Sequence, residues 1–123
     1  MSGDCRLLIV EDDEDVRRLV QTILRTHCST IDVAADGERA VELLASNAYD
    51  VVVLDIMLPK KNGFEVAEAI AAMAQPPGLV VLSAIARYFR DRFPAKTVIL
   101  QKPFDIKQLE DAVREVRPVT TNG

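Results

Sequence analysis

The residues best suited to chemistry in this sequence each follow a short apolar segment. Two carboxylates follow the first segment, one follows the third, a hydroxyl follows the fourth and an amine follows the fifth: Glu11, Asp12, Asp55, Ser83 and Lys102. If the segments are parallel strands, their carboxyl ends meet at one edge of a sheet, which is where ligands bind in open α/β sheets. The sequence therefore predicts one site built from all five side chains.

The predicted chemistry is phosphoryl transfer to a carboxylate. Three carboxylates at one edge repel one another, and a divalent cation relieves that repulsion. Oxygen ligands without nearby histidine or cysteine favour Mg²⁺. Lys102 and Ser83 add a cation and a hydrogen-bond donor for a phosphoryl group. Because aspartate is a known nucleophile, Asp55 is predicted to form an aspartyl phosphate.

Each of these residues also has an ordinary interpretation when it is taken alone. Asp55 could cap a turn, and Glu11 and Asp12 could belong to a solvated acidic turn. Ser83 could be a turn residue and Lys102 a surface charge. We favour the chemical interpretation because every one of the five follows an apolar segment.

Hydrophobic periodicity predicts the elements that position these residues. Continuous apolar segments indicate strands buried on both faces, at 7–10, 51–54, 79–82 and 97–101. The segment 30–34 alternates, which is typical of an edge strand. Helical periodicity predicts helices at 14–26, 38–46, 64–71 and 106–116. The pattern over 84–93 is only weakly helical.

Strands and helices therefore alternate along the chain, which predicts a parallel sheet with helices on both faces. The alternating strand fits the edge of a sheet in the order 2-1-3-4-5, an order matched to known folds. The expected fold is a flavodoxin-like (βα)5 three-layer sandwich of the α/β class. Apolar helix positions such as Leu19 and Ile106 should face the core, and Asp105 has capping-box spacing from Gln108.

The composition is that of one compact domain. The chain has 123 residues, 49% of them hydrophobic, and a net charge of −4 without a basic run, which argues against direct nucleic-acid binding. No segment predicts a membrane span or a signal peptide, so we expect a cytoplasmic protein with no membrane partner. Cys5 and Cys28 are expected to be reduced thiols, although a bridge between them stays open. His27 is expected at the surface.

Four motifs together resemble the receiver domain of a response regulator in two-component signalling. They are Ile9-Val10-Glu11-Asp12-Asp13, Asp55-Ile56-Met57-Leu58-Pro59 with Asn62-Gly63, Leu82-Ser83-Ala84, and Lys102-Pro103-Phe104. The resemblance covers about residues 6–117. The chain is therefore expected to be a single receiver domain over 1–123, with a flexible tail after residue 117.

The resemblance implies a role for each residue of the predicted site. The phosphoacceptor would be Asp55, and the Lys102-Pro103 peptide would be cis. The ligands of Mg²⁺ would be Glu11, Asp12, Asp55 and the Met57 carbonyl. The phosphoryl oxygens would be contacted by Ser83 and Lys102.

The resemblance also implies partners and kinetics. The phosphoryl donor would be a phosphohistidine on a sensor histidine kinase or a histidine phosphotransfer protein, docked on the exposed part of the helix that begins at Glu14. The downstream target is not implied. The domain would catalyse only its own phosphotransfer, and it would lose the phosphoryl group slowly because Met57 and Ile85, which flank the path of the attacking water, are apolar.

Two features depart from the usual pattern of receivers. Ile99 stands three residues before Lys102, where an aromatic side chain is common, and the segment between Ser83 and Lys102 is short. Both departures lie where the conformational signal leaves the site. We therefore expect phosphorylation to change the order of residues 84–96.

Other functions on similar folds fit less well. A pseudo-receiver that is never phosphorylated is the main alternative, but all five chemical positions are filled. A flavodoxin needs a loop rich in glycine and hydroxyls, whereas residues 11–15 are all acidic. A phosphatase with a carboxylate nucleophile needs a second aspartate where Met57 stands, and it is kept only as a distant alternative.

Overall fold

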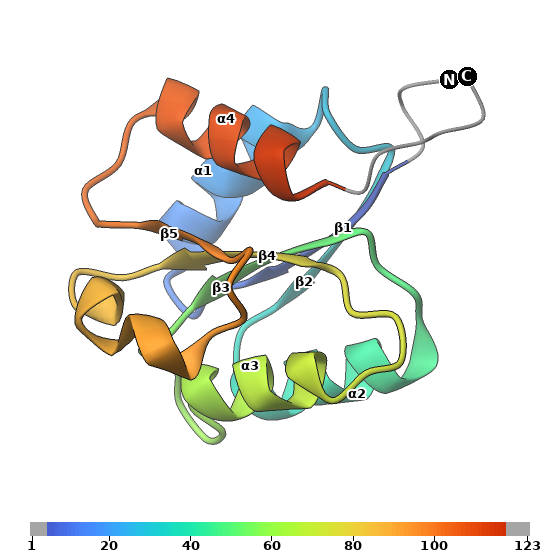
Figure 1. Ribbon diagram of the computed structural model, residues 1–123. Coiled ribbons are helices and arrows are strands. Elements are labelled where there is room, and N and C mark those ends of the chain that lie inside the picture. The colour runs from blue at the N-terminus through green and yellow to red at the C-terminus, as the bar shows by residue number, and fades with distance from the viewer. Residues whose placement is uncertain (1–4, 118–123) are drawn as a thin grey trace.

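The structure is a computed structural model in which residues 5–117 are described. Its five strands form one parallel sheet in the order β2-β1-β3-β4-β5 (Figure 1). They are β1 Arg6–Val10, β2 Thr30–Ala34, β3 Val51–Asp55, β4 Gly78–Leu82 and β5 Val98–Leu100. The flavodoxin-like fold predicted from the sequence is therefore confirmed.

Helices cover both faces of this sheet and give the predicted three layers (Figure 1). The helices are α1 Glu14–Leu24, α2 Gly37–Ser46, α3 Gly63–Ala71, the 3₁₀ helix η1 Ala86–Arg92, and α4 Ile106–Val116. α1 and α4 pack on one face, while α2, α3 and η1 pack on the other. Each face thus encloses its own apolar cluster.

The central strands are buried on both faces, as their continuous apolar sequences predict. Every residue of β3 is buried. In β1, alternate side chains point to opposite faces, so that Leu8 and Val10 join the cluster under α2 and α3 while Leu7 and Ile9 join the other. This two-sided burial holds the carboxyl ends of β1 and β3 at one level.

β2 lies at one edge of the sheet, as predicted, but its alternation is incomplete. Ile31 and Asp32 are both half-buried. Tyr49, which follows α2, donates its hydroxyl to Asp32 at 2.7 Å. Burial, together with the hydrogen bond to this carboxylate and its negative charge, raises the pKa of Tyr49 to about 12.

Side-chain caps fix the start of each α-helix in the described part of the chain. Asp13 caps α1 and Asp36 caps α2. Asn62 forms a capping box with Glu65 at the start of α3, and Asp105 does so with Gln108 at the start of α4. The second box confirms the predicted spacing, and both satisfy N–H groups that have no partner within the helix.

The weakly helical segment forms η1, which is kinked at Phe89. Phe64, near the start of α3, holds it in place. The Phe64 ring stacks on Phe93 at 5.6 Å between centroids and meets Phe89 edge-on at 5.4 Å. The Arg92 guanidinium lies 4.3 Å from the Phe64 ring centroid. Phe64 therefore contacts η1 and the residue that follows it, and Glu68 of α3 adds an ion pair with Arg92 at 3.5 Å.

Three residues lie elsewhere than the sequence predicts. Leu19 and Ile106, predicted to face the core, are 51% and 57% exposed. Leu19 borders the apolar stripe of α1, and Ile106 is in the first turn of α4, so the sheet covers neither. His27, predicted at the surface, is half-buried, with Nε2 3.0 Å from Glu110 Oε2. This contact joins the end of α1 to α4.

Cys5 and Cys28 form a disulfide, so the prediction of reduced thiols is wrong. α1 runs back along β1 and returns the chain to the start of that strand. There the Thr30 N–H donates to the Cys5 carbonyl at 3.3 Å. The two cysteines are 23 residues apart in sequence, and only this return of the helix brings them together.

Two further expectations concern the ends of the chain and membranes. The predicted flexible tail after residue 117 lies outside the described residues. Among residues 5–117, no helix combines the length and apolar character that crossing a membrane would require.

Candidate functional site

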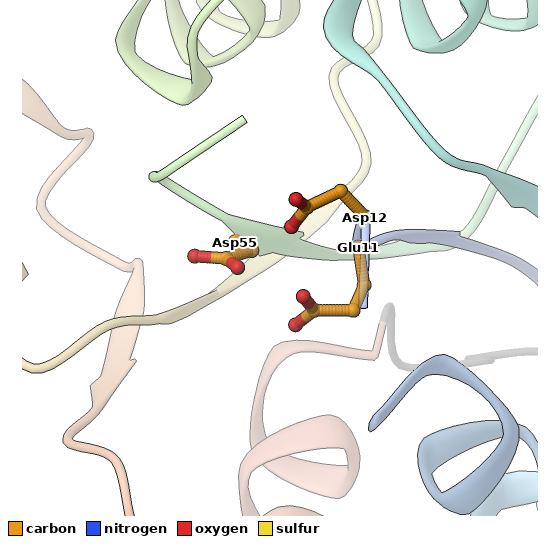
Figure 2. A group of neighbouring side chains, drawn as sticks. All are labelled: Glu11, Asp12 and Asp55. Carbon is orange, nitrogen blue, oxygen red and sulfur yellow. The ribbon is translucent and has the colours of Figure 1, made fainter. Parts of the chain in front are cut away.

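β1 and β3 bring three carboxylates to the carboxyl edge of the sheet. Glu11 and Asp12 directly follow β1, and Asp55 ends the neighbouring β3. One carboxylate oxygen from each residue lies within 4.8 Å of the others (Figure 2). Glu11 and Asp55 are only 1% and 4% exposed, whereas Asp12 is exposed. The predicted carboxylate cluster is therefore assembled.

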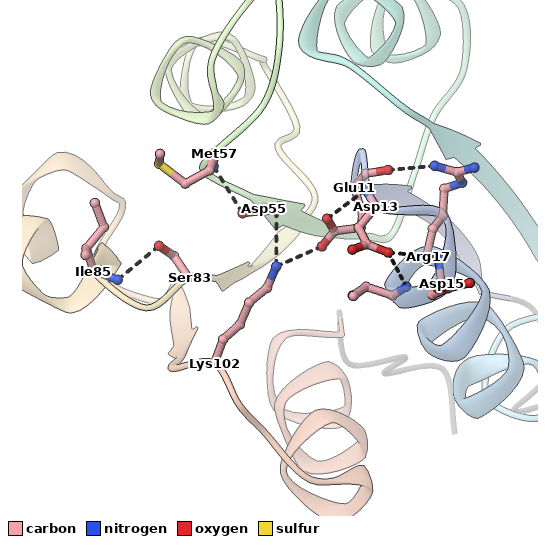
Figure 3. A network of polar contacts seen from close by, with 10 residues as sticks. Glu11, Asp13, Asp15, Arg17, Asp55, Met57, Ser83, Ile85 and Lys102 are labelled. Carbon is pink, nitrogen blue, oxygen red and sulfur yellow. Dashed lines mark hydrogen bonds and ion pairs between the residues drawn. The ribbon is translucent and has the colours of Figure 1, made fainter.

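Lys102 reaches this cluster from the turn after β5. Its Nζ donates to Glu11 Oε1 at 3.1 Å and to Asp55 Oδ2 at 3.2 Å (Figure 3). The ammonium therefore bridges two buried carboxylates that come from different strands. A cation in this position offsets their repulsion and leaves an edge on which negative oxygens are tolerated.

Burial sets the protonation of Glu11. Its carboxyl is removed from water, and the hydrogen bond with Asp55 and the negative charge of Asp55 act in the same direction. Together they raise the pKa of Glu11 from 4.5 to about 7, although Asp13 and Lys102 oppose the change. Burial lowers the pKa of Lys102, but the charges of Asp55 and Glu11 outweigh it and the net shift is upward.

The cluster suits a hard divalent cation. All three side chains of the cluster are carboxylates, a donor type that matches Mg²⁺ or Ca²⁺ in preference to softer metals. Mg²⁺ binds oxygen at about 2.0–2.1 Å, so oxygens this close to one another need only small side-chain movements to share one ion. Asp12, being exposed, is free to make such a movement.

Ser83 and Met57 lie on the other side of Asp55 from Glu11 (Figure 3). The Met57 N–H donates to Asp55 Oδ1 at 3.0 Å. The Ser83 Oγ accepts from the Ile85 N–H at 3.1 Å. Among residues 5–117, Ser83 makes no hydrogen bond with Asp55 or Lys102, so its predicted contact with a phosphoryl oxygen stays a prediction, as does the Met57 carbonyl ligand.

The loop after β3 folds closely onto the end of its own strand. The Gly63 N–H donates to the Ile56 carbonyl at 2.9 Å. A Cβ on Gly63 would overlap the Ile56 backbone and would lie 2.7 Å from the Asp55 carbonyl oxygen. Only glycine fits at this position. The close approach fixes the backbone that carries Asp55 and Met57.

Two residues that position Glu11 were assigned no role from the sequence. The Asp13 N–H donates to Glu11 Oε2 at 3.2 Å, and Arg17 Nη1 donates to the Glu11 carbonyl at 3.0 Å (Figure 3). Asp13 had a detectable signal, because it stands immediately before a predicted helix where a cap is favoured. No sequence pattern indicated the role of Arg17.

The family model described as the response regulator receiver domain matches residues 7–114. The chain belongs to this family. The match includes the two edge strands of the sheet, β2 and β5, and every residue of the carboxylate cluster. The resemblance inferred from the four motifs is therefore confirmed.

Curated relatives and solved structures agree with this assignment. The chain is 31% identical over 112 residues to the response regulator ArlR of Staphylococcus saprophyticus, covering 89% of this chain and 50% of that protein. It is 31% identical over 124 residues to the response regulator MprA of Mycolicibacterium vanbaalenii, covering 94% and 52%. The chain thus spans about half the length of the curated relatives it matches.

Among solved structures, a response regulator receiver protein from Sinorhizobium medicae superposes with a TM-score of 0.84 at 24% identity, over 92% of this chain and 94% of that one. This likeness shows the fold. The N-terminal domain of an uncharacterized protein from Wolinella succinogenes superposes with a TM-score of 0.79 at 32% identity, over 91% and 92%.

The raised pKa of Glu11 predicts a pH dependence of stability in the metal-free receiver domain. Between pH 4.5 and 7 the folded state holds a proton on Glu11 that the unfolded state has lost, so stability falls as the pH rises through this range. Glu11→Gln mimics the neutral form and should lack this component. Between pH 4.5 and 7, the free energy of unfolding of the wild type should fall by at most about 3 kcal/mol more than that of the variant. Chemical denaturation in EDTA measures both. Parallel pH profiles for the two proteins would contradict the assignment.

Proposed function

We propose that this receiver domain accepts a phosphoryl group on Asp55 from a phosphohistidine, in a reaction that depends on Mg²⁺. The observation that carries the proposal is the Lys102 ammonium held between Asp55 and Glu11. It places a cation where the negative oxygens of an incoming phosphoryl group would collect. The family to which the chain belongs supports the same reaction.

In the proposed reaction an Asp55 carboxylate oxygen attacks phosphorus, and the P–N bond to the donor imidazole breaks. The leaving imidazole nitrogen keeps the electron pair of that bond. Lys102 then turns from Asp55 to a phosphoryl oxygen, and the Ser83 hydroxyl donates to another while still accepting from Ile85. When bound, Mg²⁺ supplies positive charge at the transferring phosphoryl oxygens.

The metal would be held by carboxylates from both central strands. Glu11, Asp12 and Asp55 are the side-chain ligands in this proposal, and the Met57 carbonyl completes the protein set. Asp12 is the residue best placed to adjust, because it is the exposed member of the cluster.

The donor would approach beside Asp12. A pocket of about 510 Å³ opens there between Asp12, Met57 and Phe64. We propose a sensor histidine kinase or a histidine phosphotransfer protein as the partner, docked on the exposed face of α1. A downstream protein target would read the phosphorylated state, in the cytoplasm and without direct contact with nucleic acid or membrane by this domain.

We propose that about residues 6–117 form the receiver unit and that it is a signalling domain that catalyses only its own phosphotransfer. The main alternative, a pseudo-receiver that is never phosphorylated, is disfavoured by a complete set of chemical side chains. A phosphatase is disfavoured because it needs a second aspartate where Met57 stands. The Met57 side chain is 66% exposed and has no carboxyl group.

Phosphorylation should occur at one site and require the metal. Incubation with acetyl phosphate and Mg²⁺, followed by intact-mass measurement, should add one phosphoryl group to the wild type and none to Asp55→Asn, which keeps the shape but removes the nucleophile. Asp12→Ala should require much more Mg²⁺ for the same yield. Phosphorylation of Asp55→Asn would show that the acceptor lies elsewhere.

Loss of the phosphoryl group should be slow. Hydrolysis needs a water in line with the Asp55–phosphorus bond. Met57 and Ile85 are exposed apolar side chains. The resemblance to receiver domains puts them beside the path of that water, and neither can hydrogen-bond it. Met57→Asn is therefore expected to shorten the lifetime of the aspartyl phosphate several-fold, followed by intact mass after the donor is removed. An unchanged or longer lifetime would count against this role for Met57.

The signal should leave the site through residues 84–96. Ile99 is stiff about χ1 and has no polar tip, so it cannot swing between core and solvent as an aromatic side chain could. Ser83, by contrast, accepts a hydrogen bond at Oγ from the N–H of Ile85, the residue directly before η1. Amide hydrogen exchange should change over 84–96 on phosphorylation, with Asp55→Asn treated identically as the control. Changes confined to α4 would refute this route.

A further inference from the structure

A second pocket lies at the opposite edge of the sheet from the carboxylate cluster. It has a volume of about 600 Å³ and is formed where the amino ends of β4 and β5 meet the ends of α3 and α4. Ile70, Leu79 and Val116 supply apolar wall, together with three prolines. Its volume lies within the range of small-molecule sites, which are also lined mainly by apolar side chains.

The short η1 leaves this part of the sheet open. η1 is held by Phe64 at the start of α3, next to the carboxyl edge, whereas the pocket borders Ile70 at the other end of α3. On the other side of the pocket the start of β4 packs tightly against the end of α4, because a Cβ on Gly78 would overlap the Val116 carbonyl. The pocket is therefore a consequence of where η1, α3 and α4 lie on the sheet.

Among the buried side-chain nitrogen and oxygen atoms of residues 5–117, Thr97 Oγ1 is the one without a hydrogen-bond partner. The residue lines the pocket and is only 6% exposed, yet its Oγ1 has no hydrogen-bond partner. Its N–H is satisfied by the Pro94 carbonyl at 3.0 Å. A buried hydroxyl without a partner is costly. Rotation about Cα–Cβ to another staggered position would turn this hydroxyl toward a bound acceptor.

The charges on the pocket wall favour an anionic group beside Thr97. Lys96, the adjacent residue, is exposed and makes no ion pair within the described residues 5–117. Glu115 and Arg117 also line the pocket, and Arg117 Nη1 donates to the His27 carbonyl at 3.3 Å, so Lys96 supplies the positive charge nearest to Thr97 in sequence. A carboxylate can accept from both a hydroxyl and an ammonium, while apolar walls favour a hydrocarbon body.

We propose that this pocket binds a small carboxylate with an apolar body, with the Thr97 hydroxyl and the Lys96 ammonium as donors to its head group. The pocket shares no residue with the carboxylate cluster, so this inference does not depend on the proposed phosphorylation.

The test is a titration of the ¹⁵N-labelled protein, residues 1–123, with phenylacetate, followed by amide chemical shifts. Saturable shifts are expected at residues 78–79 and 95–97 and at the end of α4. Phenylacetamide has the same body without the charge and should bind several-fold more weakly. Thr97→Val and Lys96→Gln should each weaken phenylacetate binding several-fold, whereas Lys107→Gln, the same charge change at the exposed start of α4, should not.

Thermal unfolding separates lost binding from lost structure. Thr97→Val should melt no lower than the wild type, because it removes an unsatisfied polar group without changing the shape of the side chain. If Thr97→Val fails to fold, Thr97→Ser keeps the hydroxyl and should retain binding. Shifts that do not saturate, equal affinity for phenylacetate and phenylacetamide, or wild-type affinity in both Thr97→Val and Lys96→Gln would overturn the proposal.

Discussion

The contact of one ammonium with two buried carboxylates is the constraint around which this domain is built. Glu11 directly follows β1, Lys102 lies just beyond β5, and Asp55 ends β3. A buried charge that lost its partner would cost several kcal/mol. The strands that carry these residues must therefore keep their relative register. The two-sided apolar burial of β1, β3 and β4 provides that register, since slipping a strand by one residue would turn its side chains to the wrong face.

The same edge combines rigid and movable groups. Glu11 is fixed by Asp13, by Lys102 and through its carbonyl by Arg17, and Asp55 is fixed by the close approach of Gly63. Asp12 projects into solvent, and the Lys102 side chain is 30% exposed. A ligand can thus be met by side chains that adjust while the nucleophile and its neighbours stay in place.

The fold and most of the cluster could be predicted because they depend on local pattern. Apolar segments identify β1, β3 and β4, and their polar neighbours identify Glu11, Asp12 and Asp55. What could not be predicted depends on packing between distant segments. The bridge between Cys5 and Cys28, the bond from Arg17 to Glu11, and the exposure of Leu19 all require the positions of helices on the sheet. η1 was ambiguous because Phe64, on another element, holds it in place.

The sequence of η1 and the turn after it gives the domain an uneven charge distribution. Residues 86–96 carry Arg87, Arg90, Arg92 and Lys96 against Asp91 alone, a net charge of +3 in a chain whose total is −4. All five side chains are exposed. The positive charge at η1 thus contrasts with the acidic residues 11–15 at the start of α1. In dilute salt this uneven charge orients the domain near a charged surface before the two make contact. At physiological ionic strength the Debye length is about 8 Å, so the orienting force acts only within about that distance of the surface.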